Sequence, residues 1–293
     1  MNANDSSHEK ESGIQLDLFT WQSERIAEGW RHLEIFNFEK AEKTFNEVQR
    51  QHKDDEECAF ALKLCSQWKD IFELSNRKNS SEQTSFLFLQ WNEIMFPSAW
   101  GPQLFKKTVL NRIIQIAREN KVFYISESIS VADLLVKAQK HALAEKEILN
   151  FFQSNEKSVA LQINLANIQW NLNKIKESRL NYLEALLTNP SEIAVEIIEN
   201  LPLAKIIQKY GSEMAPAWGW MQGELPLFEF DKFKHNISPS QKGLYLYHLL
   251  IQAEKLTKQG EIKQIISIRK QLKEMDSDLY TAYFNLLKKR KLV

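Results

Sequence analysis

Small and apolar residues recur in this sequence at one fixed spacing, and this period constrains the fold more than any other feature. A period of about 34 residues predicts a repeating unit of two antiparallel helices, because one helix pair cannot bury its own apolar side and packs against the next pair. Each matched position of the first unit has its counterpart one period later: Ala132 and Ala166, Ala144 and Ser178, Ile148 and Tyr182, Phe151 and Ala185.

A third copy of the pattern lies upstream, within residues 22–55. Small residues such as Gly29 and Ala41 are expected where the two helices of a pair cross most closely, and the ring of Phe45 is expected to fill the space between one pair and the next. The sequence therefore predicts an all-α fold, in which antiparallel helix pairs form a solenoid with a helical closing segment. The matched positions of this copy are Gly29, Phe38, Ala41, Phe45 and Val48.

The pattern resembles the tetratricopeptide repeat, a family of helix-pair repeats with a period of about 34 residues. Asn189-Pro190 ends the unit at 159–192, where the family usually has proline. The resemblance implies a scaffold that binds protein partners on a concave surface lined by the first helices. A non-repeating all-α domain is the alternative interpretation. The chain departs from the family pattern at Arg25, Ser128 and Gln162, where a large apolar residue is common, and at Ser178, where alanine is usual.

Composition narrows the class of protein. The chain has only 8 Gly and 7 Pro in 293 residues, which argues against a turn-rich β protein and against glycine-rich phosphate loops. Its 38 Lys and Arg balance its 38 Asp and Glu. A neutral chain has no overall positive field to attract nucleic acid, so we expect no direct nucleic-acid binding.

Three further observations predict a cytoplasmic protein without membrane association. The polar residues at 1–11 do not resemble a signal peptide. No apolar run reaches about 18 residues, the length of a membrane-spanning helix. Cys58 and Cys65 lie too far apart along one predicted helix to form a disulfide, and sparse cysteine usage indicates a reducing compartment.

The chain divides into segments of distinct composition. Prolines and glycine at 96–102 predict a break between two helices, and Pro202 predicts another break in a helical stretch. The predicted segments are a disordered tail at 1–12, an N-terminal helical repeat region at 13–75, a helical connector at 82–120, tandem repeats at 125–211, an aromatic irregular loop at 212–240 and a C-terminal helical segment at 241–293.

The aromatic loop is the main irregularity of the chain. Residues 214–228 combine Trp218 and Trp220 with two glycines and two prolines, a composition that predicts no regular helix. A long aromatic loop in a helical protein either plugs an apolar end of the solenoid or lines its groove. Sequence alone leaves both roles open.

A short motif near the N-terminus suggests a specific partner. The residues Gln15-Leu16-Asp17-Leu18-Phe19 resemble the pentapeptide by which bacterial proteins bind the replication sliding clamp. The resemblance implies that Leu18 and Phe19 enter an apolar pocket of the clamp while Gln15 forms hydrogen bonds at its rim. The alternative is structural: these apolar side chains would cap the first repeat and be buried, because a solenoid needs such end caps.

The sequence does not suggest an enzyme. Its histidines are scattered, and no metal-binding cluster, nucleophile motif or nucleotide motif is present, so we expect no catalytic residues, metal or cofactor. We expect a protein-interaction scaffold that binds a protein or peptide partner. The alternative is an accessory factor of DNA replication or repair that docks on the sliding clamp. Besides Gln15, Leu16, Leu18, Phe19, Trp218 and Trp220, the predicted binding residues are Gln162, Asn164, Gln169 and Asn173, whose amides would hold a peptide backbone.

Overall fold

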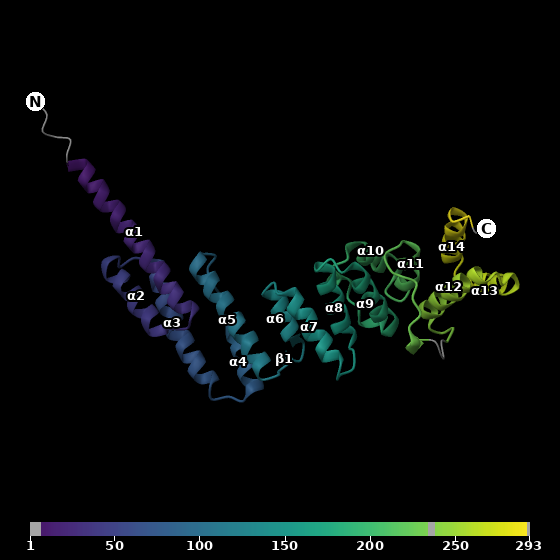
Figure 1. Ribbon diagram of the computed structural model, residues 1–293, viewed down its shortest axis with the longest axis horizontal. Coiled ribbons are helices and arrows are strands. Elements are labelled where there is room, and N and C mark those ends of the chain that lie inside the picture. The colour runs from purple at the N-terminus through teal and green to yellow at the C-terminus, as the bar shows by residue number, and fades with distance from the viewer. Residues whose placement is uncertain (1–6, 234–237, 292–293) are drawn as a thin grey trace, which may run out of the picture. The chain divides into compact units, whose positions relative to one another are not determined.

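The computed structural model describes the backbone of residues 7–233 and 238–291 (Figure 1). Within those ranges, side chains are described for residues 21–231, 233 and 238–291. The described chain is all-α apart from one short β-hairpin, so the predicted all-α class is confirmed. It divides into two compact units, Met1–Gln139 and Lys140–Val293.

The N-terminal unit consists of helices that pack mainly on their sequence neighbours, with α1 also contacting α5. Its two-stranded antiparallel hairpin follows α5. No pattern in the sequence predicted this hairpin. The elements are α1 (Ser7–Glu34), α2 (Phe38–Gln51), α3 (Glu56–Ser75), α4 (Ser80–Glu93), α5 (Trp100–Glu119), β1 (Tyr124–Ser126), β2 (Ile129–Ser130) and α6 (Val131–Lys137).

Polar residues fix where these helices begin. The side chain of Asn37 accepts a hydrogen bond from the N–H of Lys40 at the start of α2, and Asp55 accepts one from Cys58 at the start of α3. Ser130 and Asp133 form a reciprocal capping box on α6. Such caps satisfy backbone N–H groups that have no partner inside the helix.

Aromatic rings and close helix contacts form the core of the N-terminal unit. Trp30 and Phe45 are buried and meet edge to face, with their ring centroids 5.5 Å apart. A Cβ atom at Gly29 would lie 2.5 Å from the ring of Phe45, so only glycine lets the ring pack directly on the α1 backbone. The sequence spacing thus places glycine at a close contact between α1 and α2.

The described residues of the C-terminal unit form a longer series of helices and three short 3-10 turns. Two clusters of buried side chains form its core, one around Tyr182 and the other around Tyr283, and Trp218 packs against both. The elements are α7 (His141–Phe152), α8 (Val159–Asn171), α9 (Ile175–Thr188), η1 (Pro190–Glu192), η2 (Val195–Ile197), α10 (Leu201–Tyr210), α11 (Ala215–Met221), η3 (Asp231–Phe233), α12 (Lys242–Gln259), α13 (Ile262–Met275) and α14 (Ser277–Lys289).

The helix pairs α1–α2, α8–α9 and α12–α13 turn through the same backbone geometry. Each turn contains one residue with positive φ, which is 56° at Phe36, 58° at Asn173 and 76° at Gly260. The N–H of the next residue donates to a carbonyl five residues earlier, an arrangement that satisfies the helix end. These bonds run from Asn37 to His32, from Lys174 to Gln169 and from Glu261 to Leu256. Gln139, one period before Asn173, also has a φ of 58°.

Most residues of the repeat pattern are buried. Ser178, which stands where the repeat family usually has alanine, is fully buried, and its hydroxyl donates to the carbonyl of Ala166 at 2.7 Å. This bond explains why the chain tolerates a polar group there. Phe38 and Phe151 are only partly buried. The buried positions are Gly29, Ala41, Phe45, Val48, Ala132, Ala144, Ile148, Ala166, Ser178, Tyr182 and Ala185.

Two predicted boundaries are corrected by the structure. Pro202 stands in the first turn of α10 and begins that helix, because the N–H that proline lacks has no partner in a first turn. Residues 7–12 of the predicted tail belong to α1, whereas residues 1–6 lie outside the described residues.

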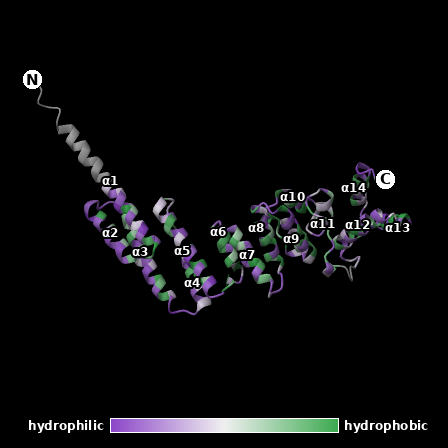
Figure 2. Ribbon diagram, in the orientation of Figure 1, coloured by the Kyte–Doolittle hydropathy of each residue, from purple (hydrophilic) through white to green (hydrophobic). Residues whose placement is uncertain are grey.

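Hydrophobic and hydrophilic residues are interspersed along the helices, as amphipathic helices with one buried side require (Figure 2). In the part of the chain that the structure describes, no helix combines the length and the apolar character needed to cross a bilayer.

Candidate functional site

The aromatic segment predicted as an irregular loop contains a short helix, α11, so that prediction is wrong over Ala215–Met221. Pro216 fits the first turn of α11, and the segment after the helix folds back on it. The N–H groups of Glu224 and Leu225 both donate to the carbonyl of Gly219, at 2.8 and 3.1 Å. A Cβ atom at Gly219 would lie 2.7 Å from the side chain of Leu225, so glycine lets Leu225 pack closely on α11.

Tyr247 of α12 holds the following residues in place. Its hydroxyl accepts a hydrogen bond from the N–H of Phe228 at 2.9 Å and donates to the carbonyl of Pro226 at 3.0 Å. Tyr247 is buried, and this burial raises the pKa of its hydroxyl, which therefore remains protonated as a donor. A single buried side chain thus fixes the backbone of residues 226–228.

The fixed segment forms one side of an open cavity of about 540 Å³, which we call the Trp220 groove. Phe228 remains 45% exposed within this lining. The cationic residues of the lining are Lys176, Arg179 and Arg290. Its apolar lining consists of Leu180, Trp220, Leu225, Pro226, Leu227 and Phe228.

Both arginines of the groove are held by carboxylates. Nη2 of Arg179 lies 2.9 Å from the carboxylate of Glu224, and Nη1 of Arg290 lies 3.2 Å from that of Glu254. The guanidinium of Arg290 also lies over the ring of Trp220, 5.7 Å from its centroid. These contacts orient the guanidinium groups before any ligand arrives.

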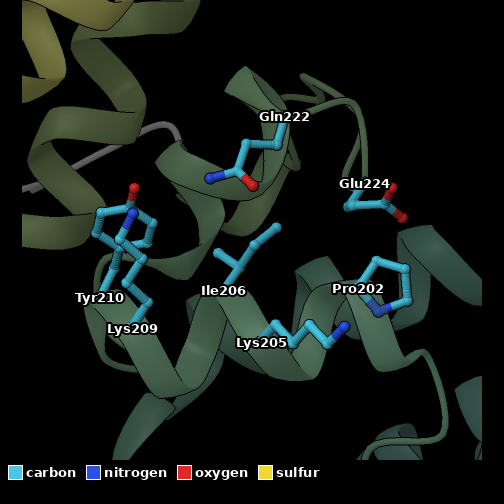
Figure 3. A pocket seen from close by; sticks show the side chains of 7 residues that line it. All are labelled: Pro202, Lys205, Ile206, Lys209, Tyr210, Gln222 and Glu224. Atoms are coloured by element: carbon cyan, nitrogen blue, oxygen red, sulfur yellow. The ribbon is translucent and has the colours of Figure 1, made fainter.

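A second opening, of about 300 Å³, lies between α10 and the end of α11. Ile206 lies in its middle, with Gln222 and Glu224 on one side and Lys205 on the other (Figure 3). Beside it, Tyr210 stacks on Trp218 with ring centroids 4.1 Å apart and an interplanar angle of 7°. We call this opening the Ile206 opening. Glu224 belongs to its lining and Arg179 to that of the Trp220 groove, so their ion pair connects the two.

The structure does not place the predicted amide residues together on an open surface. Gln162 is fully buried, and both polar atoms of its amide lack a hydrogen-bond partner among the described residues. Gln169 is also buried; it donates to Glu145 and accepts from Asn181. Asn173 is exposed in the turn between α8 and α9, and Asn164 is half-buried. The four amides do not form one face because Gln162 and Gln169 point into the core.

The two predicted tryptophans have different surroundings. Trp218 packs against both core clusters and Tyr210, whereas Trp220 packs against the cluster around Tyr283 and also lines the groove. The segment therefore partly fills the core and partly lines a groove. Sequence reasoning missed Arg179, Arg290 and Phe228, and no local pattern marks the two arginines, which lie far apart in the sequence.

The proposed clamp-binding residues Gln15, Leu16, Leu18 and Phe19 fall within the backbone range of α1. Their side chains lie outside the described residues. Both alternatives, an exposed binding motif and a buried helix cap, therefore stay predictions. They differ in the exposure of these four side chains.

Neither the models of known protein families, nor the curated proteins, nor the solved structures give a match to this chain. Across the described side chains, no group of three or more His, Cys, Asp or Glu residues is arranged to hold a metal ion. The geometry of the Trp220 groove is therefore the feature that points to a function.

Proposed function

We propose that this protein is a non-catalytic interaction scaffold of tetratricopeptide-like helix pairs, and that the Trp220 groove binds a peptide segment of a protein partner. The observation that carries the proposal is the exposure of Phe228 inside a groove whose other walls are also largely apolar. Recessed apolar surface with polar groups at its edge is typical of binding grooves.

The groove has the properties that favour peptide binding. Apolar side chains of a peptide would remove Phe228 and Trp220 from water, which contributes about 25 cal/mol for each Å² of apolar surface buried. The hydrogen bonds of Tyr247 hold the wall formed by residues 226–228 in one conformation. Less ordering is then required on binding, and this lowers the entropic cost of the complex.

A selection of peptides on the full-length protein tests this function. Random peptides displayed on phage are selected on the immobilised wild-type chain, and enriched peptides are then measured against variants. We expect a shared motif whose binding is lost in Phe228→Ala. Leu149→Ala is the matched control, because Leu149 lies on α7 outside the groove and is 44% exposed.

Two results would contradict the proposal. In the first, selection yields no shared motif. In the second, the enriched peptides bind Phe228→Ala and Trp220→Ala as tightly as the wild type. Circular dichroism of each variant shows whether its helical fold is retained, so that a loss of binding is assigned to the groove.

The pentapeptide at residues 15–19 supports a second candidate function, docking on a bacterial sliding clamp as an accessory factor of replication or repair. The test is a pull-down of the purified clamp by the wild-type chain and by Phe19→Ala. Binding that depends on Phe19 supports this function. Equal retention of the clamp by both proteins, or no retention by either, contradicts it.

A further inference from the structure

We infer that the Trp220 groove selects an acidic peptide segment, in which Asp or Glu residues flank an aromatic or aliphatic anchor. This inference rests on the proposed peptide-binding function and adds the chemistry of the partner. The cationic groups Lys176, Arg179 and Arg290 share the lining with Trp220 and Phe228, and among the described residues no carboxylate belongs to that lining.

The groove retains positive charge that its neighbours do not neutralise. Glu224 and Glu254 pair with the two arginines from outside the lining. Lys176 is exposed at the start of α9 and forms no ion pair within the described ranges of the chain. An incoming carboxylate would therefore meet one uncompensated positive charge and two oriented guanidinium groups.

The paired arginines can still bind a ligand. A guanidinium has five N–H donors, and a single carboxylate contact leaves several of them available. The side chains of Arg179 and Arg290 are 30% and 41% exposed, so solvent and ligands reach both groups. Arg290 also lies over Trp220, which places a cation beside the apolar surface that would receive the anchor.

This arrangement favours an acidic peptide over a nucleic acid. A nucleic-acid strand carries a charge on every nucleotide, and binding depends on many uncompensated cations along its path. Here two of the three cations are already paired with carboxylates. Much of the apolar lining is aliphatic or proline, namely Leu180, Leu225, Pro226 and Leu227, and these residues offer no flat ring on which a base could stack.

The peptides selected on the wild-type protein provide the test. We expect enriched sequences to carry Asp or Glu beside Leu, Phe, Tyr or Trp. A synthetic peptide of this kind is compared with its copy in which Gln and Asn replace Glu and Asp. We expect the neutral copy to bind roughly tenfold more weakly, and the difference to shrink as salt is added.

Charge variants assign this effect to the groove. Lys176→Gln and Arg290→Gln together should weaken binding of the acidic peptide by roughly tenfold and weaken binding of the neutral copy clearly less, because only the acidic peptide loses charge attraction. Lys205→Gln is the matched control, because Lys205 is an exposed lysine that lines the Ile206 opening and not the groove. It should leave the affinity for both peptides unchanged. Circular dichroism confirms that each variant is folded.

The outcomes distinguish a failure of this inference from a failure of the proposed function. Enriched peptides that are neutral or basic, yet lose binding in Phe228→Ala, would overturn the acidic partner and leave the peptide groove intact. A selection without any shared motif would overturn both. An oligothymidylate that displaces the selected peptide from the wild type but not from the double variant would show that the groove takes nucleic acid, and would also overturn the inference.

Discussion

The guanidinium of Arg179 and the carboxylate of Glu224 lie 2.9 Å apart, and this ion pair connects α9 to the segment that follows α11. Both side chains are shielded from solvent over more than two thirds of their surface. Arg179 lines the Trp220 groove and Glu224 lines the Ile206 opening. The pair therefore contributes to the stability of the wall and also orients a cation in the groove.

We predict a measurable coupling between Arg179 and Glu224. In a double-mutant cycle of Arg179→Ala and Glu224→Ala, urea unfolding should give a coupling free energy of about 0.5–1 kcal/mol, because the pair is partly shielded from water. The control is the exposed pair Lys270–Glu274, whose atoms are 3.8 Å apart on one helix. Its coupling should be smaller, and equal couplings for the two pairs would contradict the prediction.

We predict that Tyr247→Phe loosens the groove wall. The substitution leaves the N–H of Phe228 and the carbonyl of Pro226 without their partner, which should lower the free energy of unfolding by about 1–3 kcal/mol. Amide exchange at residue 228 should accelerate. Tyr245→Phe is the control, since that hydroxyl makes only a 3.3 Å contact with Gln271 in a partly exposed site. A similar loss in both variants would assign no special role to Tyr247.

The all-α fold could be predicted because the pattern that encodes it is local. Positions one period apart, such as Ala132 and Ala166, are both buried, since periodic small and apolar residues determine which side of a helix packs. Polar residues that interrupt the pattern were harder to interpret. Gln162 and Gln169 were predicted to hold a peptide backbone on an open surface, but both are buried, because the apolar residues of α8 occupy most of its circumference.

The groove could be predicted only in part. Trp218 and Trp220 marked the segment, but their different roles depend on contacts with Tyr210 and Tyr283 that are distant in the sequence. The proximity of Arg179 and Arg290 to one cavity depends on the packing of α9, α11 and α14, and no periodicity encodes it. The positive φ of Phe36 was also not predictable, since a bulky residue rarely adopts it.

We predict that Gly29→Ala destabilises the N-terminal unit by about 1–3 kcal/mol, because the added methyl group would overlap the ring of Phe45. Thermal or urea unfolding followed by circular dichroism measures the change. Ser23→Ala is the control on the same helix, because Ser23 is exposed and alanine favours a helix there.

A second substitution tests the cause of that loss. Phe45→Leu shortens the side chain that meets the new methyl group, so Gly29→Ala with Phe45→Leu should be less destabilised than the sum of the two single changes. Simple additivity would show that the effect of Gly29→Ala comes from elsewhere in the unit.

We predict that both cysteines of the native protein resist alkylation. Burial raises the pKa of the Cys58 thiol to about 12, and the negative charge of Asp55 adds to the rise; burial also raises the pKa of Cys65 to about 12, with a smaller contribution from Glu42. The reactive thiolate is therefore scarce near neutral pH, and the reagent cannot reach it. Iodoacetamide at pH ~8 should modify both cysteines rapidly in urea and very slowly in the native protein.

The rate of cysteine alkylation in the native state should rise in Gly29→Ala, because local opening becomes more frequent as the N-terminal unit loses stability. Mass spectrometry measures both rates, and rapid labelling of either cysteine in the native wild type would show that the helices around it open without global unfolding.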